Sequence, residues 1–92
     1  MDYSERAEIY QEAISKFGDF AQKLMAIEEM AELIQAICKD FRGKLDLLNV
    51  IEETADVKIM MEQLEILYNI SEPLVDAIDT KIVRLRKRIP TE

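Results

Sequence analysis

The sequence predicts an all-α fold, with four helices in a single domain. Apolar residues recur three and four positions apart along most of the 92 residues, which is the period of a helix. Only two Gly and two Pro occur, and no linker is long enough to separate two domains. A second domain would leave too little buried surface for either, so we treat residues 1–92 as one domain without strands.

Breaks in the apolar periodicity divide the chain into four helical stretches. Gly18 precedes the second stretch, Gly43 lies between the second and the third, and Pro73 stands at the start of the fourth. The expected helices span residues 3–17, 20–40, 47–69 and 73–89.

Side chains suited to capping precede each expected helix. A capping box pairs an acceptor side chain with an acidic or amide side chain three residues later. Two pairs have this spacing, namely Asp2 with Glu5 and Asp19 with Gln22. Asp46 and Ser71 are suited to cap the third and fourth helices.

The charge is uneven along the chain. The formal net charge is −7, but residues 1–80 hold seven basic and eighteen acidic side chains, a net charge of −11. Residues 81–92 carry five basic side chains and one acidic side chain, a net charge of +4. A body this acidic is a poor binder of nucleic acid, which requires a basic surface for phosphate, and it is suited to divalent cations.

Composition excludes several chemistries. With Cys38 as the single cysteine and no His, the chain has no internal disulfide framework, no Cys- or His-based zinc site, and no Ser-His-Asp or Cys-His catalysis. No apolar run approaches the length of a membrane span, and the first twelve residues are too charged for a signal peptide. We therefore expect a cytoplasmic protein without a membrane partner.

The second and third expected helices contain two similar segments. Residues 26–33 (AIEEMAEL) and 50–57 (VIEETADV) share the pattern of a small or branched residue, Ile, two Glu, any residue, Ala, an acid and an aliphatic residue. Two copies 24 residues apart are too few and too close for a repeat array. We interpret them as two facing helices with similar acidic patches.

Both patches lie within apolar stripes of their helices. At about 100° per residue, Glu32 lies within about 60° of Glu29, and the same arc holds apolar residues such as Met25. Glu53 and Asp56 share an apolar arc in the same way on the third helix. Carboxylates are rarely buried without a partner, and four close together repel one another unless they are protonated or bridged by cations.

Two interpretations of these acids are open. They could flank the stripe and reach water, or pair with Lys or Arg of a neighbouring helix. No basic residue lies on either stripe, however, and the motif occurs on both helices, which favours a metal site. Oxygen-only donors suit Mg²⁺, Mn²⁺ or Ca²⁺, and the absence of His departs from carboxylate-bridged di-iron bundles. Because Mg²⁺ commonly binds a few carboxylates together with substrate phosphates, this donor set points to phosphate chemistry.

The spacing of the acids resembles a known family. Glu28-Glu29-x-x-Glu32, then twenty residues, then Glu53-x-x-Asp56, resembles the EExxE…ExxD pattern of the MazG-like all-α NTP pyrophosphohydrolases. Residues 53–64 (ETADVKIMMEQL) and the position of Gln22 are also similar to that family, and the resemblance covers roughly residues 17–68.

The resemblance implies a fold, an activity and roles for the acids. The fold is a four-helix module that assembles into a helical-bundle homodimer or dimer of dimers. The activity is hydrolysis of a nucleoside triphosphate to the monophosphate and pyrophosphate, by attack of Mg²⁺-activated water at the α-phosphorus, with Mn²⁺ as a substitute metal. The implied metal ligands are Glu29, Glu32, Glu53 and Asp56. Glu28 and Glu52 are the implied catalytic residues, one of which orients the attacking water or supports a ligand.

Substrate contacts are expected from the last helix and from the two acidic stripes. Lys81, Arg84 and Arg88 share one face of the last helix and are suited to bind phosphates, although a cationic helix end also complements the macrodipole. Gln22 and Asn49 lie on the acidic stripes and could contact base or sugar, or orient carboxylates. Leu85 stands where the family often has an Asn, which puts that contact and the nucleotide preference in doubt.

Other functions are open at this stage. The chain could be a non-catalytic helical dimerisation module whose acids choose its partner, or an antitoxin-like or phage regulatory protein that binds nucleotides without turnover. Under either function we still expect a homodimer or homotetramer, because a small chain that buries carboxylates has little core of its own.

Overall fold

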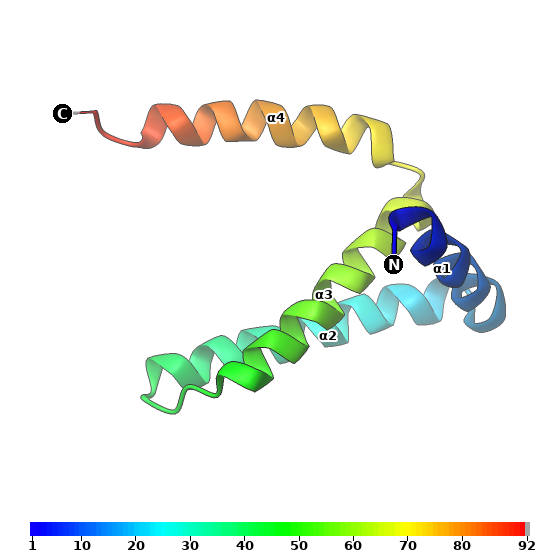
Figure 1. Cartoon of the computed structure of the whole chain (residues 1–92), viewed down its shortest axis with the longest axis horizontal. Coiled ribbons are helices and arrows are strands. Elements are labelled where there is room, and N and C mark those ends of the chain that lie inside the picture. The colour runs from blue at the N-terminus through cyan, green and yellow to red at the C-terminus, as the bar shows by residue number, and fades with distance from the viewer. Residues whose placement is uncertain (92) are drawn as a thin grey trace.

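The computed structural model describes residues 1–91 and contains four helices, with no strand in that range. Their bounds are α1 Tyr3–Phe17, α2 Asp19–Phe41, α3 Leu47–Tyr68 and α4 Ser71–Arg88 (Figure 1). The predicted all-α class and the four helices are confirmed, and each predicted boundary lies within two residues of the observed one. No described helix is both long enough and apolar enough to cross a membrane.

Two of the four predicted caps are present and two are corrected. The Asp2 carboxylate accepts a hydrogen bond from the Glu5 N–H at 2.9 Å, and that of Asp46 accepts one from the Asn49 N–H at 3.1 Å. Asp19 and Ser71 are instead the first residues of their helices, after Gly18 and Ile70. Gly18 has φ 90°, a conformation that glycine adopts readily, and it is both the C-cap of α1 and the N-cap of α2, so no side chain caps the start of α2.

The antiparallel pair α2 and α3 forms the centre of the molecule. Near one end, Gln22 Nε2 donates a 2.7 Å hydrogen bond to Gln63 Oε1, and further along the carboxylates of Glu29 and Asp56 approach each other. Ala26 and Met60 are buried between these two places. The small α2 side chain lets the two helices lie close together there, which brings the polar groups on either side of it into contact.

Helix α1 packs across the end of this pair where α2 begins and α3 ends (Figure 1). Tyr10 is its one buried residue, and Arg6 of α1 forms an ion pair with Glu62 of α3 at 3.0 Å. The core that results is small, because no large side chain in the described chain is fully buried. The buried residues of the described chain all come from α1, α2 and α3.

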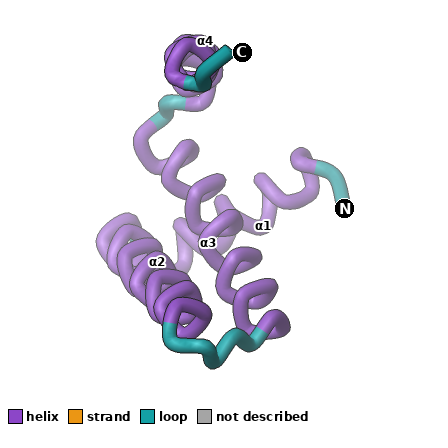
Figure 2. Tube along the Cα trace, turned by 90° about the vertical axis from the view of Figure 1, so that its left-hand side faces the viewer, coloured by secondary structure: helices purple, strands orange, loops and turns teal. Residues whose placement is uncertain are grey.

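Helix α4 extends away from the other three helices. Asn69 adopts the left-handed conformation at φ 54°, and the Ile70 and Asn69 N–H groups donate to the Glu65 and Ile66 carbonyls. This pair of bonds is a Schellman motif, which ends α3 sharply. Figures 1 and 2 both show α4 apart from the α2–α3 pair, and every described side chain from Val75 onwards is exposed.

Candidate metal centre

Three of the predicted acids meet at the middle of the α2–α3 contact. One carboxylate oxygen from each of Glu29, Glu53 and Asp56 lies within 4.8 Å of the other two. Glu29 comes from α2, while Glu53 and Asp56 are one turn apart on α3. The antiparallel packing of the two helices therefore gathers carboxylates that are more than twenty residues apart in sequence.

The fourth predicted ligand, Glu32, lies one turn further along α2, and its side chain is exposed. It does not belong to the group of three, but it is close enough to Glu53 for its carboxyl to raise the pKa of that side chain.

Burial and mutual repulsion both oppose ionisation of this cluster. Partial burial is the largest cause that raises the pKa of Glu29, followed by the negative charges of Asp56 and Glu32. Partial burial also raises the pKa of Glu53, helped by the contact with Glu32 and the charge of Asp56. An opposite charge nearby would lower both pKa values.

Two oxygen atoms of the cluster have no partner. Glu29 Oε2 and Glu53 Oε2 are buried, and neither makes a hydrogen bond. Among residues 1–91, the one ion pair joins Arg6 to Glu62. No Lys or Arg side chain of that range therefore forms an ion pair with the cluster. Buried carboxylate oxygens without donors are costly, and cations remove that cost.

The donor set fits a hard divalent cation. All three side chains offer carboxylate oxygens, which Mg²⁺, Mn²⁺ and Ca²⁺ prefer, and the one thiol, Cys38, lies outside the cluster. The set does not select among these ions. The two unpartnered oxygens are the structural reason to place a cation here.

The two predicted catalytic acids stand beside the cluster and outside it. Glu28 and Glu52 each precede a clustered Glu by one residue, so their side chains turn about 100° away around the helix. Both side chains are exposed. The charge of Glu52 is the smallest of the causes that raise the pKa of Glu53.

The two predicted amides lie on opposite sides of the cluster along the helix pair. Gln22 is buried seven residues before Glu29, where it is hydrogen-bonded to Gln63. Asn49 is half-buried in the first turn of α3, four residues before Glu53. Gln22 therefore stabilises the contact between α2 and α3, an interaction that any substrate contact would have to replace.

The predicted phosphate-binding residues are separated from the acids in a single chain. Lys81, Arg84 and Arg88 lie on α4, and all three are exposed. Because α4 lies apart from α2 and α3 (Figures 1 and 2), one chain does not combine the basic face and the acidic cluster in one site.

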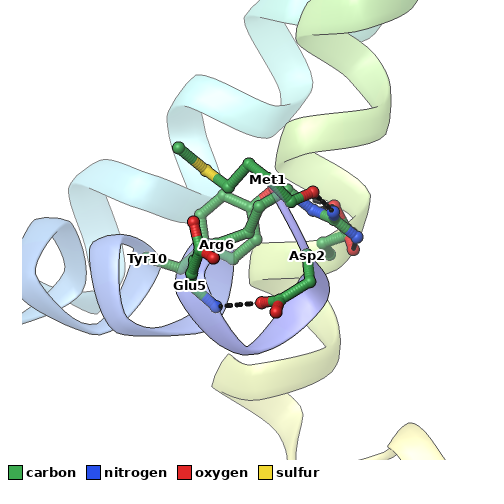
Figure 3. Close-up of polar contacts among 6 residues, drawn as sticks. Met1, Asp2, Glu5, Arg6 and Tyr10 are labelled. Atoms are coloured by element: carbon green, nitrogen blue, oxygen red, sulfur yellow. Dashed lines mark hydrogen bonds and ion pairs between the residues drawn. The ribbon is translucent and has the colours of Figure 1, made fainter.

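Sequence reasoning missed a second polar cluster, between α1 and α3. Arg6 Nε and Nη2 donate to the two carboxylate oxygens of Glu62 at 3.0 Å each, and the Tyr10 hydroxyl donates to Glu62 Oε1 at 2.7 Å. Arg6 and Tyr10 stand one turn apart on α1 (Figure 3). The hydrogen bond from Arg6 is the largest cause that lowers the pKa of Glu62, whereas burial raises the pKa of Tyr10.

Comparison with known proteins adds no relative. No family model matches the chain, and searches of curated proteins and of solved structures found no match either. The resemblance to the MazG-like enzymes thus depends on the acidic motif and its surroundings alone.

Proposed function

We propose that this protein is a Mg²⁺-dependent nucleoside triphosphate pyrophosphohydrolase of the MazG-like type, which converts an NTP or dNTP to the monophosphate and pyrophosphate. The observation that carries this proposal is the pair of buried, unpartnered oxygens in the acidic cluster, Glu29 Oε2 and Glu53 Oε2. The spacing of the acids in the sequence supports the same activity.

The clustered acids bind the cation in this proposal. Glu29, Glu53 and Asp56 supply the first oxygens, and Glu32 is near enough to join them. Bound Mg²⁺, or Mn²⁺ in its place, supplies charge neutralisation for the triphosphate and activation of water at neutral pH. The exposed carboxylates of Glu28 and Glu52 are suited to orient that water or to accept its proton.

The phosphate contacts require more than one chain. The basic face of α4, which carries Lys81, Arg84 and Arg88, lies apart from the acids of its own chain. We therefore propose that the active form is a homodimer or homotetramer in which α4 meets another subunit. The charges of α4 and of the acidic body attract one another in such an assembly.

A second function is favoured by the exposed apolar surface. Large apolar side chains are exposed along α2, α3 and α4, as in a helical dimerisation or nucleotide-binding regulatory module without catalysis. That function gives the acids no chemical role, so their conversion to amides would leave binding intact. Turnover of a nucleotide separates the two functions directly.

Pyrophosphate release from a panel of NTPs and dNTPs tests the proposal. The wild type should release pyrophosphate only with Mg²⁺ or Mn²⁺, and Glu53→Gln should remove that activity. Glu12→Gln, at an exposed glutamate of α1, is the matched control and should keep it. A folded, Mg²⁺-supplied wild type that releases no pyrophosphate from any nucleotide would leave the non-catalytic module as the better account.

A further inference from the structure

A single chain exposes much more surface than a folded protein of its size. Its accessible surface is 7556 Å², whereas a compact monomer of 10.7 kDa is expected to expose about 5,500 Å². Its radius of gyration is 16.2 Å, against about 12 Å for a compact domain of this length. The excess of about 2,000 Å² is larger than the ~800 Å² that each partner contributes to a standard protein interface.

Helix α4 contributes one part of this excess. Five apolar side chains, four on the helix and one just past it, recur at alternating steps of three and four, which is the a/d spacing of helices that pack against a partner. All are exposed, from 47 % at Ile78 to 59 % at Val75. We call these residues the α4 stripe: Val75, Ile78, Ile82, Leu85 and, just past the helix, Ile89.

Helix α2 also exposes apolar side chains, on the face opposite its acids. From Phe20 to Phe41 an apolar or small residue recurs at alternating steps of four and three, centred roughly 180° from Glu29. The end residues, Phe20 and Phe41, are 80 % and 86 % exposed. We call this face the α2 stripe: Phe20, Leu24, Ile27, Ile34 and Phe41, with Ala31 and Cys38 between them.

The α4 stripe cannot cover the α2 stripe of its own chain. Only Asn69 and Ile70 connect α3 to α4, and both donate backbone hydrogen bonds to the last turn of α3. The acids of α2 face α3, so the α2 stripe points away from α3. To reach it, α4 would have to cross α2 from a two-residue connection, and a second chain has no such constraint.

We propose that the α4 stripe of one copy packs along the α2 stripe of a second copy, and that the reverse contact completes a two-fold dimer. The two stripes share one spacing, and their lengths of about 21 Å and about 32 Å allow full coverage of α4. Each copy supplies both surfaces, so the contact is self-complementary and closes. This contact uses the apolar stripe of α4 and the face of α2 opposite the acids, so it leaves the basic face of α4 and the acidic cluster uncovered. It is separate from the phosphate contacts proposed above and does not depend on the protein being an enzyme.

Charge supports this arrangement over a parallel pairing of two α4 helices. Residues 81–88 hold five basic side chains and no acid, so two such ends side by side would repel. The body of the second copy has a net charge of −11 over residues 1–80, which attracts the basic end of α4.

Sedimentation at several concentrations, with helix content measured in parallel, tests the interface. The wild type should be dimeric or larger, and Ile82→Lys on α4 and Ile34→Glu on α2 should each shift it to monomer. Thr80→Lys, on the opposite face of α4, is the control and should leave the assembly unchanged. If the Ile34→Glu variant remains dimeric while Ile82→Lys becomes monomeric, α4 pairs with α4 of the second copy. That result overturns the proposal.

Mixing the two disrupted variants separates loss of the interface from loss of folding. A dimer of Ile82→Lys with Ile34→Glu keeps one unaltered contact and places both introduced charges, which are opposite in sign, in the other. The mixture should therefore recover dimer that neither variant forms alone. Failure of the mixture to dimerise, with both chains helical, would show that α4 does not pack on α2 of a second copy.

Discussion

The interface between α2 and α3 contains two groups of polar side chains about two helical turns apart. The two groups differ in whether their polar atoms have hydrogen-bond partners. At one, the buried amides of Gln22 and Gln63 satisfy each other through a 2.7 Å hydrogen bond. At the other, the carboxylates of Glu29 and Glu53 each keep one buried oxygen without a partner. We call the hydrogen-bonded pair Gln22–Gln63 the closed contact, and the acidic cluster with its unpartnered oxygens the open contact.

The carboxylate of Glu62 can be compared with those of Glu29 and Glu53. Arg6 and Tyr10 donate three hydrogen bonds to it, and its pKa is lowered, whereas the pKa values of Glu29 and Glu53 are raised. This protein thus compensates a carboxylate where the role is to join helices. Among the described residues, the cluster has no such ion pair, and two of its oxygens have no hydrogen-bond partner.

The largest expected effect is on activity, from a change in the open contact. Asp56→Asn keeps the size of the side chain and removes one charge, so kcat/KM for pyrophosphate release should fall about 100-fold or more. Its free energy of unfolding without metal should not fall, because the variant also removes repulsion within the cluster. Activity assays with chemical denaturation measure both.

Loss of the closed contact, by contrast, should leave activity largely unchanged. The double variant Gln22→Leu with Gln63→Leu should keep Mg²⁺-dependent activity within a few-fold of the wild type. If instead that double variant loses activity while Asp56→Asn keeps it, the assignment of the open and closed contacts is reversed.

Mg²⁺ should stabilise the folded chain through the open contact. A ligand at 100 times its dissociation constant adds about 2.7 kcal/mol to the free energy of unfolding, provided that it binds the folded state only. The wild type should gain on that scale, and the double variant Glu29→Gln with Glu53→Gln should gain nothing. Thermal unfolding with and without Mg²⁺ measures this, with Ca²⁺ added separately to compare the ions.

The closed contact should respond to one substitution more than to two. Gln22→Leu leaves the buried Gln63 carbonyl without its donor, which should cost about 1–3 kcal/mol. Adding Gln63→Leu removes the unpaired group and should recover most of that loss. A double-mutant cycle in urea measures the coupling, and simple additivity of the two losses would count against a specific amide pair.

The smallest effect should be the pH dependence that Glu62 contributes. Its pKa is lowered from 4.5 in the folded chain, so between that lowered value and 4.5 the unfolded state binds more protons. The stability it contributes is present above about pH 4.5 and is lost as the pH falls through the lowered pKa. Glu62→Gln should therefore lower stability at neutral pH and reduce its decline in acid, as urea unfolding across the acidic range would show.

The helices and the acidic cluster could be predicted from sequence because each depends on local periodicity. The spacing of Glu29 and Glu53 within apolar stripes placed both acids between α2 and α3, where the structure has them. The corrected starts of α2 and α4 arise at Gly18 and Ile70, where backbone conformation decides the boundary without a capping side chain.

Contacts between distant residues could not be predicted in the same way. The pairs Gln22–Gln63 and Arg6–Glu62 depend on the register between helices, which the periodicity of one helix does not determine. The departure of α4 depends on two residues after α3, Asn69 and Ile70, whose hydrogen bonds set its direction. An apolar stripe in the sequence shows that a helix needs a partner and does not show which chain supplies it.

Titration with Mn²⁺, followed by the loss of the free-ion electron paramagnetic resonance signal, tests the central claim most directly. The wild type should bind Mn²⁺ without nucleotide, Mg²⁺ should compete with it, and Glu29→Gln with Glu53→Gln should bind none. Glu12→Gln is the control and should bind as the wild type does. A wild type that leaves Mn²⁺ free, or a cluster variant that binds it equally well, would contradict the assignment of the open contact as a metal centre.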